Sequence, residues 1–392
     1  MIGNNEYNLI ELLIPKTTGA GIDWTSFERT KIRSLLAQMS EIKQEKEYHG
    51  EGDVFTHTKL VCQALIEDER YQAESDDGKI VLFLAALLHD VGKITRTREE
   101  NGKILSPKHS LAGSLMAREF LWKELGLCGN ERARDIRESV CTLIKYHSFP
   151  PYAIREEDAE RRLLKIAACG ELAPLFSVKR LCILERADVL GRIAKDKKEC
   201  LGRVEYCELL AEEIGCLERP YLFSSTYAQR GYFQGRTSWK DQPLFNDTWG
   251  EVILLCGLPG TGKDTWITKN YPNLPMLSLD EIRKELSIPP TKEQGEVVSL
   301  AKERAKEYLR KKQPFVWNAT NITADIRGKL ISLFERYGAS VKTVFLETEW
   351  EEEQRRNENR LAVVPQKVIE KMLSKTTLPE RFESEIVVWE TT

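Results

Sequence analysis

The fold of the second half of this chain is decided by the stretch Val252-Ile253-Leu254-Leu255-Cys256-Gly257-Leu258-Pro259-Gly260-Thr261-Gly262-Lys263. An apolar strand runs into a glycine-rich turn that ends in lysine, and a segment compatible with a helix follows at residues 264–270. This order turns the G-x-x-x-x-G-K spacing into a P-loop, in which backbone N–H groups curl around a phosphate and the lysine reaches its outer oxygens. The alternative is a plain glycine turn between a strand and a helix, which the spacing disfavours.

Nucleotide binding is therefore expected at this loop, with ATP or another NTP as the ligand. The residues expected to hold it are Gly257, Pro259, Gly260, Thr261, Gly262, Lys263, Asp264 and Thr265. The position after the P-loop lysine is usually Ser or Thr, whose hydroxyl binds Mg²⁺. Here that position is Asp264, with Thr265 next, so the sequence leaves open which of the two side chains handles Mg²⁺.

The P-loop also divides the chain, because such a loop normally follows the first strand of its domain. With 392 residues, the chain is long enough for two or three domains. Residues 1–235 read mostly as helix, with a core at about 25–215, and residues 236–249 read as an irregular connector. From residue 250 to 392, strands alternate with helices, which predicts an α/β domain with a parallel sheet.

The expected elements follow from apolar spacing and turn residues. In the first part, helices are expected at 27–45, 56–67, 79–89, 110–125, 130–147, 163–168, 179–193 and 202–214, with breaks at 76–78 and 149–151. In the second part, strands are expected at 252–256, 275–278, 314–318, 341–346 and 385–389. The helices expected between these strands are 263–269, 280–286, 293–312, 323–337 and 349–373.

The bulk composition excludes several classes of protein. Hydrophobic residues make up 41% of the chain and charged residues 30%, as in a soluble globular protein. No apolar run approaches the length of a membrane span and no signal peptide is evident, so a cytoplasmic protein is expected. Nine cysteines without C-x-x-C spacing indicate reduced thiols. A net charge of −3 argues against broad wrapping of nucleic acid but permits a local basic site.

All five histidines, His49, His57, His89, His109 and His147, precede residue 150. His89 is followed directly by Asp90 at the end of an apolar helix, and Asp188 lies in a later helix. Imidazole and carboxylate together suit Mn, Fe, Co, Ni or Zn better than Mg. A bound metal would acidify water and so supply hydroxide for attack on phosphorus. A helical histidine with a purely structural role is the alternative.

A second set of polar residues follows the P-loop. The strand at 275–278 leads to Asp280 and Arg283, and ligands of parallel sheets gather at the carboxyl ends of strands. A carboxylate placed there can accept the proton of an attacking hydroxyl, although Asp280 could instead cap the helix that starts at Glu281. Further on, Arg356 and Arg360 are spaced to share one helix face. Phosphoryl transfer favours guanidinium groups near the γ-phosphate, whereas a solvated charged surface is the alternative.

The first part of the chain resembles the HD-domain metal-dependent phosphohydrolases over about residues 25–215. The resemblance rests on the segments 49–57 (HGEGDVFTH) and 87–93 (LLHDVGK) and on the later His109, His147 and Asp188. It implies that one ion is held by His57, His89, Asp90 and Asp188, and that His109 and His147 match ligands of a second ion. It also implies that Lys93 faces a substrate phosphate and that His49 contacts substrate or shapes the loop.

The second part resembles the polynucleotide 5′-kinases of the phage end-healing type, which carry an Asp-x-x-Arg acceptor motif and an arginine-bearing lid. By this resemblance Asp280 is the general base, Arg283 grips the phosphate beside the acceptor hydroxyl, and Arg356 and Arg360 are lid arginines ahead of residues 361–365. Thr320 and Asn321 match the motif after the third strand, whereas Asn318 stands where an acid is often found. Mg²⁺ is sufficient for such a kinase.

The order of the two parts looks like the bacterial HD-Pnk proteins, which combine 3′-end phosphoesterase and 5′-end kinase activities. The resemblance implies metal-dependent removal of 3′-phosphate or 2′,3′-cyclic phosphate, with Mn²⁺, Co²⁺ or Ni²⁺, and NTP-dependent phosphorylation of 5′-OH ends of RNA or DNA. A separate nucleic-acid ligase is the expected pathway partner. Two alternatives remain, a nucleotidase fused to a nucleoside or nucleotide kinase and a non-enzymatic nucleotide sensor. The sequence leaves the oligomeric state open.

Overall fold

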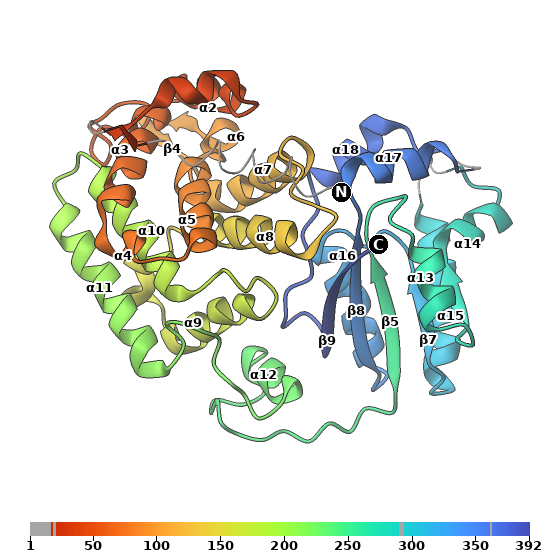
Figure 1. The fold of residues 1–392 in the computed structure, drawn as a ribbon. Coiled ribbons are helices and arrows are strands. Elements are labelled where there is room, and N and C mark those ends of the chain that lie inside the picture. The colour runs from red at the N-terminus through yellow and green to blue at the C-terminus, as the bar shows by residue number, and fades with distance from the viewer. Residues whose placement is uncertain (1–16, 19–20, 290–293, 361–362) are drawn as a thin grey trace. The chain divides into compact units, whose positions relative to one another are not determined.

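The computed structural model describes residues 17–18, 21–289, 294–360 and 363–392 of the chain (Figure 1). Their contacts form two compact units. One consists of Met1–Cys128 and Arg132–Tyr221, and the other of Gly129–Glu131 and Leu222–Thr392. The division thus falls earlier than residue 235, where the sequence suggested the end of the first domain, and the domain limits remain a prediction.

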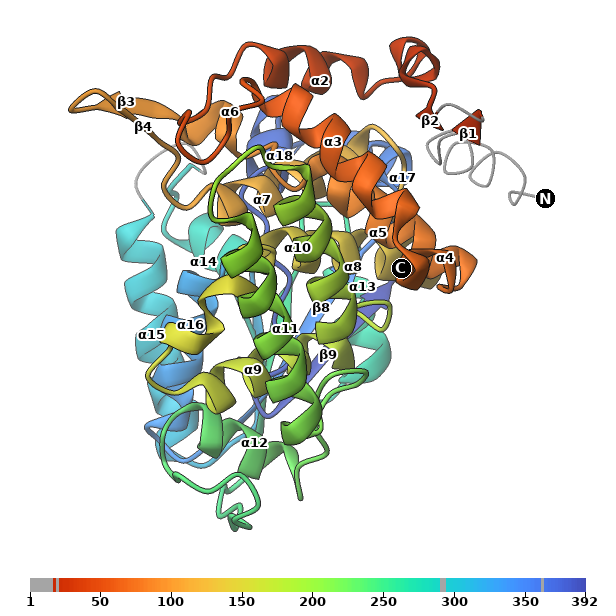
Figure 2. The same cartoon turned by 90° about the vertical axis from the view of Figure 1, so that its left-hand side faces the viewer.

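The first unit is helical, as predicted. Its α-helices are α2 (Arg33–Ser40), α3 (Val54–Glu67), α4 (Glu69–Gln72), α5 (Asp76–Leu88), α6 (Lys93–Arg96), α7 (His109–Lys123), α8 (Glu131–Tyr146), α9 (Ala159–Ala167), α10 (Val178–Gly191) and α11 (Lys197–Ile214). Short 3₁₀ turns η1 (Trp24–Arg29), η2 (Pro150–Arg155) and η3 (Ala168–Glu171) and the hairpins β1–β2 (Thr17–Thr18, Gly21–Ile22) and β3–β4 (Arg98–Glu100, Lys103–Leu105) complete it. Figure 2 shows α10 and α11 side by side, in agreement with their contacts.

Helix α5 forms the centre of this unit and carries the His89-Asp90 pair at its end. Residues 80–88 are all buried, and the helix packs against α3 and α10. It begins where the Ser75 hydroxyl accepts a hydrogen bond from the Gly78 N–H at 3.2 Å, which is a serine N-cap. The segment 76–78, which the sequence suggested as a break, is therefore the first turn of α5.

The predicted helix at 27–45 is wrong. The chain forms the 3₁₀ turn η1, bends at Thr30, and then forms α2, which ends at Ser40. Thr30 has extended backbone angles, and its hydroxyl donates a hydrogen bond to the Phe27 carbonyl at 2.8 Å. The buried Phe27, Ile32 and Met39 therefore reach the core from separate short segments, although their spacing resembles that of one amphipathic helix.

The second unit is built on a five-stranded parallel sheet, as predicted. The strands are β5 (Glu251–Cys256), β6 (Met276–Ser278), β7 (Phe315–Asn318), β8 (Ser340–Glu347) and β9 (Ile386–Thr391), in the spatial order β6-β7-β5-β8-β9 (Figure 1). The P-loop strand β5 lies in the middle, and its residues 252–256 are fully buried, as expected of a strand with parallel neighbours on both sides. The carboxyl ends of the parallel strands thus meet at the edge that bears the P-loop.

Helices connect these strands and extend the predicted pattern. They are α12 (Thr226–Phe233), α13 (Lys263–Asn270), α14 (Leu279–Glu285), α15 (Gly295–Arg310), α16 (Ala324–Glu335), α17 (Trp350–Glu358) and α18 (Gln366–Leu373). Helix α12 precedes the connector that the sequence suggested at 236–249, and residues 236–249 contain no helix or strand. The single helix predicted at 349–373 is wrong, because α17 ends at Glu358 and the Asn357 side chain hydrogen-bonds both the N–H and the carbonyl of Val364. Residues 361–362 lie outside the described part.

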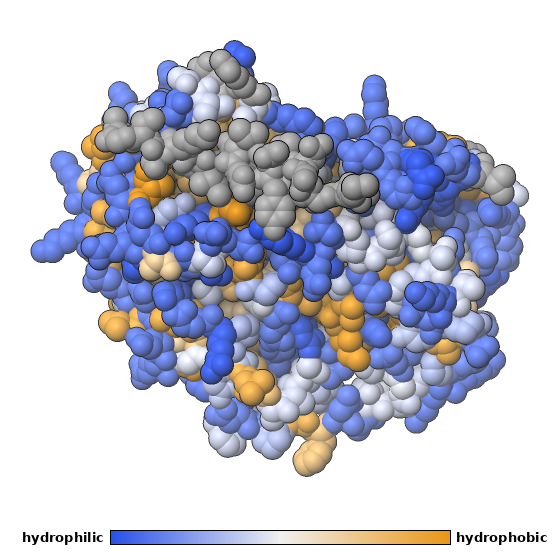
Figure 3. Space-filling view, viewed as in Figure 1, coloured by the Kyte–Doolittle hydropathy of each residue, from blue (hydrophilic) through white to orange (hydrophobic). Residues whose placement is uncertain are grey.

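Among the helices in the described part, none is long and apolar enough to cross a bilayer. On the face seen in Figure 3, hydrophilic residues predominate and hydrophobic ones lie in small separate groups. All nine cysteines are buried free thiols.

Candidate metal centre and phosphate-binding loop

Four of the five histidines converge on one point of the first unit. His57 lies on α3, His89 follows α5, His109 begins α7 and His147 follows α8. The Nε2 atoms of His57 and His89 are 3.4 Å apart, and those of His109 and His147 are 3.3 Å apart. Residues separated by up to 90 positions in the sequence thus present the same ring nitrogen to a shared centre.

Three of these rings are anchored through their other nitrogen. The carbonyl oxygens of Ala86, Ser106 and Ile144 lie 2.8, 2.9 and 2.7 Å from Nδ1 of His89, His109 and His147, respectively. A carbonyl only accepts, so each Nδ1 is the donor and each ring directs its Nε2 to the centre. Burial lowers the pKa of His109, and burial with the neighbouring His109 and His89 lowers the pKa of His147 to about 3.

Two carboxylates complete the cluster. Asp90 lies between the histidine pairs, with Oδ2 3.3 Å from His89 Nε2 and Oδ1 3.4 Å from His109 Nε2. Asp188 Oδ1 lies 2.9 Å from His57 Nε2. Burial opposes the charge of Asp90, but Lys93 and His89 hold its pKa well below the usual value. All six predicted metal ligands are therefore brought together, and Asp90 is shared between two groups of donors.

The donor set fits divalent metal ions. Two lone pairs that face each other at 3.3 Å, as in the pair His109 and His147, repel unless a cation lies between them. Donors that share one ion at about 2.1 Å each lie roughly 3.0–3.4 Å apart, and the measured separations are close to that range. The groups His57, His89, Asp90 and Asp90, His109, His147 each have their donor atoms within 4.8 Å of one another. Nitrogen-rich sites of this kind favour transition metals over Mg²⁺.

Glu51 is a residue of this centre that the sequence reasoning did not single out. Its Oε1 lies 2.8 Å from Nδ1 of His49 and 2.9 Å from Nδ1 of His57, and its Oε2 accepts a hydrogen bond from the Ile193 N–H at 2.8 Å. Glu51 therefore holds His57 through a close charge contact at Nδ1, whereas hydrogen bonds to backbone carbonyls orient the other three rings. In the sequence, the only hint of this role was the position of Glu51, an acidic residue two positions after His49.

Lys93 and His49 border the cluster. Lys93 Nζ lies 2.7 Å from Asp90 Oδ2 and donates to Gln44 Oε1 at 2.6 Å, so this buried cation is held beside the shared carboxylate. His49 contacts Glu51 and does not face the shared centre. Its ring lies edge-on to that of His57, with the centroids 4.9 Å apart.

The second site is the loop between β5 and α13. Gly257, Gly260 and Gly262 have φ angles of 142°, 86° and 74°, which L-residues rarely adopt. A Cβ on Gly257 would lie 2.5 Å from the Leu346 carbonyl oxygen, so the loop also needs glycine there for space. Lys263 begins α13 and its Nζ donates to the carbonyls of Gly257 and Leu258 at 3.1 and 2.7 Å.

Several polar groups near the loop support its backbone. The Gly257 N–H donates to the Thr320 carbonyl at 2.9 Å, and Asn321 Nδ2 donates to the Leu255 carbonyl at 2.6 Å. Asn318 Nδ2 donates to Asp264 Oδ1 at 2.6 Å and so orients that carboxylate, although Asp264 and Thr265 are both exposed. The choice between Asp264 and Thr265 for Mg²⁺ stays open.

Asp280 lies between two arginines at the carboxyl edge of the sheet. It forms an ion pair with Arg283, and Arg360 Nη2 lies 3.7 Å from its Oδ2. The cap of α14 is Ser278, whose Oγ accepts from the Glu281 N–H at 3.4 Å. The alternative that Asp280 caps this helix is therefore wrong, and its carboxylate projects into solvent with the two guanidinium groups.

Arg356 and Arg360 do not lie on one face of a helix. Arg356 lies on α17 and bonds Glu352 at 2.6 Å and Thr392 Oγ1 at 3.1 Å. Arg360 lies beyond the end of α17 and reaches Asp280. The predicted shared face is wrong, because the helix stops at Glu358. Of the two predicted lid arginines, the structure brings only Arg360 to the acceptor carboxylate.

Family models match both units. Residues 54–169 match the HD domain. Residues 252–379 match an AAA domain of the P-loop kinase-like type. The chain thus joins a phosphohydrolase-type domain to a kinase-type domain. A divalent metal is implied for the HD domain, and an NTP with Mg²⁺ for the kinase-like domain.

The kinase-like domain contains one further group that the sequence did not reveal. Glu353 on α17 is 2% exposed, and neither carboxyl oxygen has a hydrogen-bond partner among the described residues. It packs against the phosphate loop, since a Cβ on Gly260 would lie 3.4 Å from its Oε1. Burial raises the pKa of Glu353 to about 7, against the opposing effect of Lys263 and Arg360.

Proposed function

We propose that this protein repairs the ends of broken nucleic acid strands. The HD domain would remove a 3′-phosphate or 2′,3′-cyclic phosphate, and the kinase-like domain would transfer the γ-phosphate of an NTP to a 5′-OH end. The observation that carries the proposal is the position of Asp280 between Arg283 and Arg360, in the same domain as the P-loop lysine. A base flanked by two phosphate-binding groups suits a hydroxyl acceptor that bears a phosphate of its own.

In the kinase reaction, Asp280 accepts the proton of the 5′-OH as that oxygen attacks the γ-phosphorus. The bond from the γ-phosphorus to the β,γ-bridging oxygen breaks, and the nucleoside diphosphate leaves. Lys263 and Arg360 stabilise the charge on the transferred phosphoryl group, and Arg283 holds the phosphate next to the acceptor hydroxyl. The backbone N–H groups of the loop hold the remaining phosphates.

In the hydrolase reaction, His57, His89, Asp90 and Asp188 would hold one divalent ion, and Asp90, His109 and His147 a second. Such ions supply hydroxide at neutral pH. The chain's own part is to present neutral Nε2 atoms through the Nδ1 anchors and to hold Lys93 beside Asp90, where it can offset the charge of the substrate phosphate. Because nitrogen donors predominate, Mn²⁺, Co²⁺ or Ni²⁺ should support hydrolysis better than Mg²⁺.

The two reactions would leave a 3′-OH and a 5′-phosphate. These are the ends that a nucleic-acid ligase joins, so an enzyme of that reaction class would consume the product. We place the protein in the cytoplasm on the composition of its chain.

A competition experiment tests the proposed substrate. The protein is incubated with γ-labelled ATP, Mg²⁺ and a mixture of a 5′-OH oligonucleotide and free nucleosides at equal concentration. Label should enter the oligonucleotide, because Arg283 requires a phosphate beside the acceptor hydroxyl. Preferential labelling of the free nucleosides would contradict the proposal and favour an enzyme of nucleotide metabolism.

A further inference from the structure

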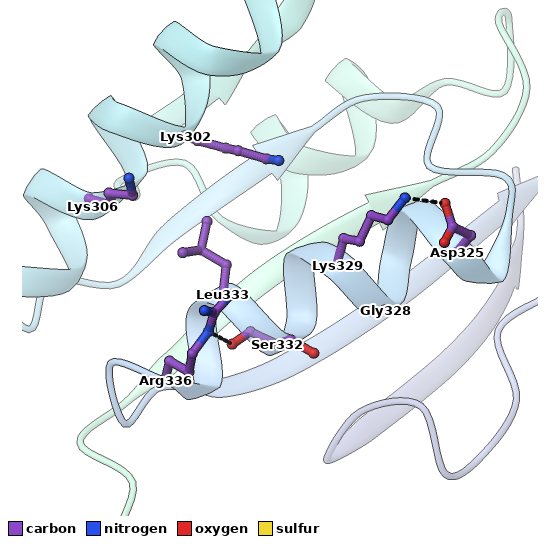
Figure 4. A pocket seen from close by; sticks show the side chains of 8 residues that line it. All are labelled: Lys302, Lys306, Asp325, Gly328, Lys329, Ser332, Leu333 and Arg336. Atoms are coloured by element: carbon purple, nitrogen blue, oxygen red, sulfur yellow. Dashed lines mark hydrogen bonds and ion pairs between the residues drawn. The ribbon is translucent and has the colours of Figure 1, made fainter.

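A basic groove lies between α15 and α16 of the kinase-like domain, apart from the two sites described above (Figure 4). Its volume is about 650 Å³. The residues that line it are Lys302, Lys306, Asp325, Gly328, Lys329, Ser332, Leu333 and Arg336. The close view shows Lys302 extending from α15 towards the side formed by α16.

The groove has cationic rims and a floor of small and apolar residues. Lys302 and Lys306 lie on α15, Lys329 lies on α16, and Arg336 directly follows the last residue of α16. Gly328 and Ser332 keep the floor low, and a Cβ on Gly328 would meet nothing within 4 Å. The lining holds four cations and one carboxylate, in a chain whose net charge is −3. This local excess of positive charge is the pattern expected of a site for polyanions.

The cations of the groove have at most weak surface contacts. Lys306 pairs with the exposed Glu303 at 2.7 Å. Lys302 has no hydrogen-bond or ion-pair partner within the described ranges. Lys329 pairs with Asp325 at 2.7 Å, but both side chains are largely exposed. Exposed pairs of this kind contribute little to stability, so a phosphate can displace the carboxylate at little cost. Arg336 donates only its Nε–H, to the Ser332 carbonyl at 3.1 Å.

The groove starts near the phosphate-transfer site and leads away from it. Helix α16 begins at Ala324, directly after the segment 318–323 that follows β7, and Thr320 in this segment accepts the hydrogen bond of the P-loop Gly257 N–H. From Asp325 to its last residue, Glu335, the helix rises about 15 Å, which is long enough for several consecutive phosphates of a strand.

We propose that this groove binds the phosphodiester backbone of the acceptor strand, beyond the nucleotide whose 5′-OH meets Asp280. The inference rests on the proposed kinase function and adds a second contact region to it. Cationic rims over a small-residue floor contact backbone phosphates and offer little to distinguish bases, so the groove would increase affinity for any sequence. It would make the kinase favour long strands over very short ones.

The test compares two acceptors and two protein variants. The acceptors are a 5′-OH trinucleotide and a 5′-OH 20-mer with the same first three nucleotides. The double variant Lys302→Glu/Lys329→Glu reverses charge on both rims, and Lys269→Glu, at the exposed end of α13, is the matched control. The double variant should raise KM for the 20-mer about tenfold and weaken its salt dependence, because phosphate contacts release counterions. KM for the trinucleotide and for ATP should not change.

An unchanged KM for the 20-mer would contradict the proposal that the groove binds the acceptor strand. An equal rise in KM for both acceptors would also contradict it, since the effect would then lie in the catalytic site. Thermal melting checks that the variants are folded. Wild-type protein that phosphorylates neither acceptor would contradict the proposed function instead. In that case fluorescence anisotropy of a labelled 20-mer tests whether the groove binds the strand. Unchanged binding of the 20-mer by the double variant would contradict the proposed role of the groove.

Discussion

At the scale of single residues, the chemistry of the HD domain depends on which ring nitrogen each histidine leaves free. Backbone carbonyls engage Nδ1 of His89, His109 and His147, and Glu51 engages Nδ1 of His57. Since the carbonyl oxygens lie three residues earlier in the chain, local backbone geometry prepares these ligands before any metal arrives. Glu51 does the same across a loop, and its contact with the Ile193 N–H explains its fixed position.

The Mg²⁺ ligand of the kinase can be assigned by two substitutions. Asp264 and Thr265 are both exposed, but only Asp264 is oriented by a described side chain, that of Asn318. Because orientation by a neighbour is typical of a group with a defined role, we now expect Asp264→Asn to raise the Mg²⁺ concentration needed for half-maximal kinase activity about tenfold. Thr265→Ala should change it less than twofold. The reverse pattern would assign the role to Thr265, and 3′-phosphate removal serves as the folding control.

The pH dependence of nucleotide binding follows from Glu353 and Lys263. Burial, with Arg360 nearby, lowers the pKa of Lys263 to about 8, and burial raises that of Glu353 to about 7. As pH rises, Glu353 becomes negative first and Lys263 then loses its positive charge, so both changes weaken the binding of an anionic NTP. KM for ATP should therefore rise roughly tenfold between pH 6.5 and 8.5, since each titrating group changes affinity by at most tenfold per pH unit.

Substitution of Glu353 separates the two contributions to that profile. Glu353→Gln keeps the shape of the side chain and removes the titration near pH 7, so KM for ATP should stay flat to about pH 8 and rise only above it. The measurement is KM for ATP across this pH range for both proteins. Superimposable profiles would show that Glu353 does not act on the nucleotide.

At the scale of elements, long periodic segments were predictable and their interruptions were not. The run of apolar residues in α5 and the alternation of β5 to β9 with helices follow from residue type alone. The failures, at 27–45 and 349–373, lie where side-chain contacts end a helix, through the Thr30 hydroxyl in one case and Asn357 in the other. Apolar spacing continues across both breaks, so periodicity does not reveal them.

The same distinction applies to the sites. The P-loop was identified from residue types at a characteristic spacing, and the metal ligands from the resemblance to HD-domain phosphohydrolases. Glu51 and Glu353 were not, because their roles come from contacts across the fold. The spacing that suggested a shared face for Arg356 and Arg360 assumed one continuous helix, and the structure ends that helix between them.

The junction between α5 and α7 offers a prediction for the HD domain. A Cβ on Gly92 would lie 2.1 Å from the His109 carbonyl oxygen and 2.4 Å from the Gly113 nitrogen. Gly92→Ala should therefore push the start of α7 away from the His89-Asp90 pair and lower the free energy of unfolding by about 1–3 kcal/mol. Phosphoesterase activity should fall at least tenfold and the melting temperature of this domain should drop, with kinase activity retained.

Gly202→Ala in α11 is the matched control for that substitution. A Cβ there would meet nothing within 4 Å, and alanine favours a helix over glycine by about 1 kcal/mol. Its phosphoesterase activity should equal that of the wild type. Equal losses in the two variants would show that the close approach at Gly92 does not hold the site together.

At the scale of the whole molecule, the chain consists of two compact units with separate cores and separate chemistry. The metal cluster lies entirely in one unit, and the P-loop, Asp280 and the basic groove lie in the other. The net charge of −3 is a sum over the whole chain, so it does not reveal the local cluster of four cations in the basic groove. Two units with independent cores should retain function independently when one site is disabled.

The most direct test of the account uses one oligonucleotide that carries both a 5′-OH and a 3′-phosphate. Wild-type protein, Lys263→Ala and Asp188→Ala, each confirmed as folded by circular dichroism, are incubated with it, ATP, Mg²⁺ and Mn²⁺, and both ends are analysed. We predict that the wild type converts both ends, that Lys263→Ala changes only the 3′ end, and that Asp188→Ala changes only the 5′ end. Loss of both reactions in folded Lys263→Ala, or no reaction at either end with the wild type, would contradict the account.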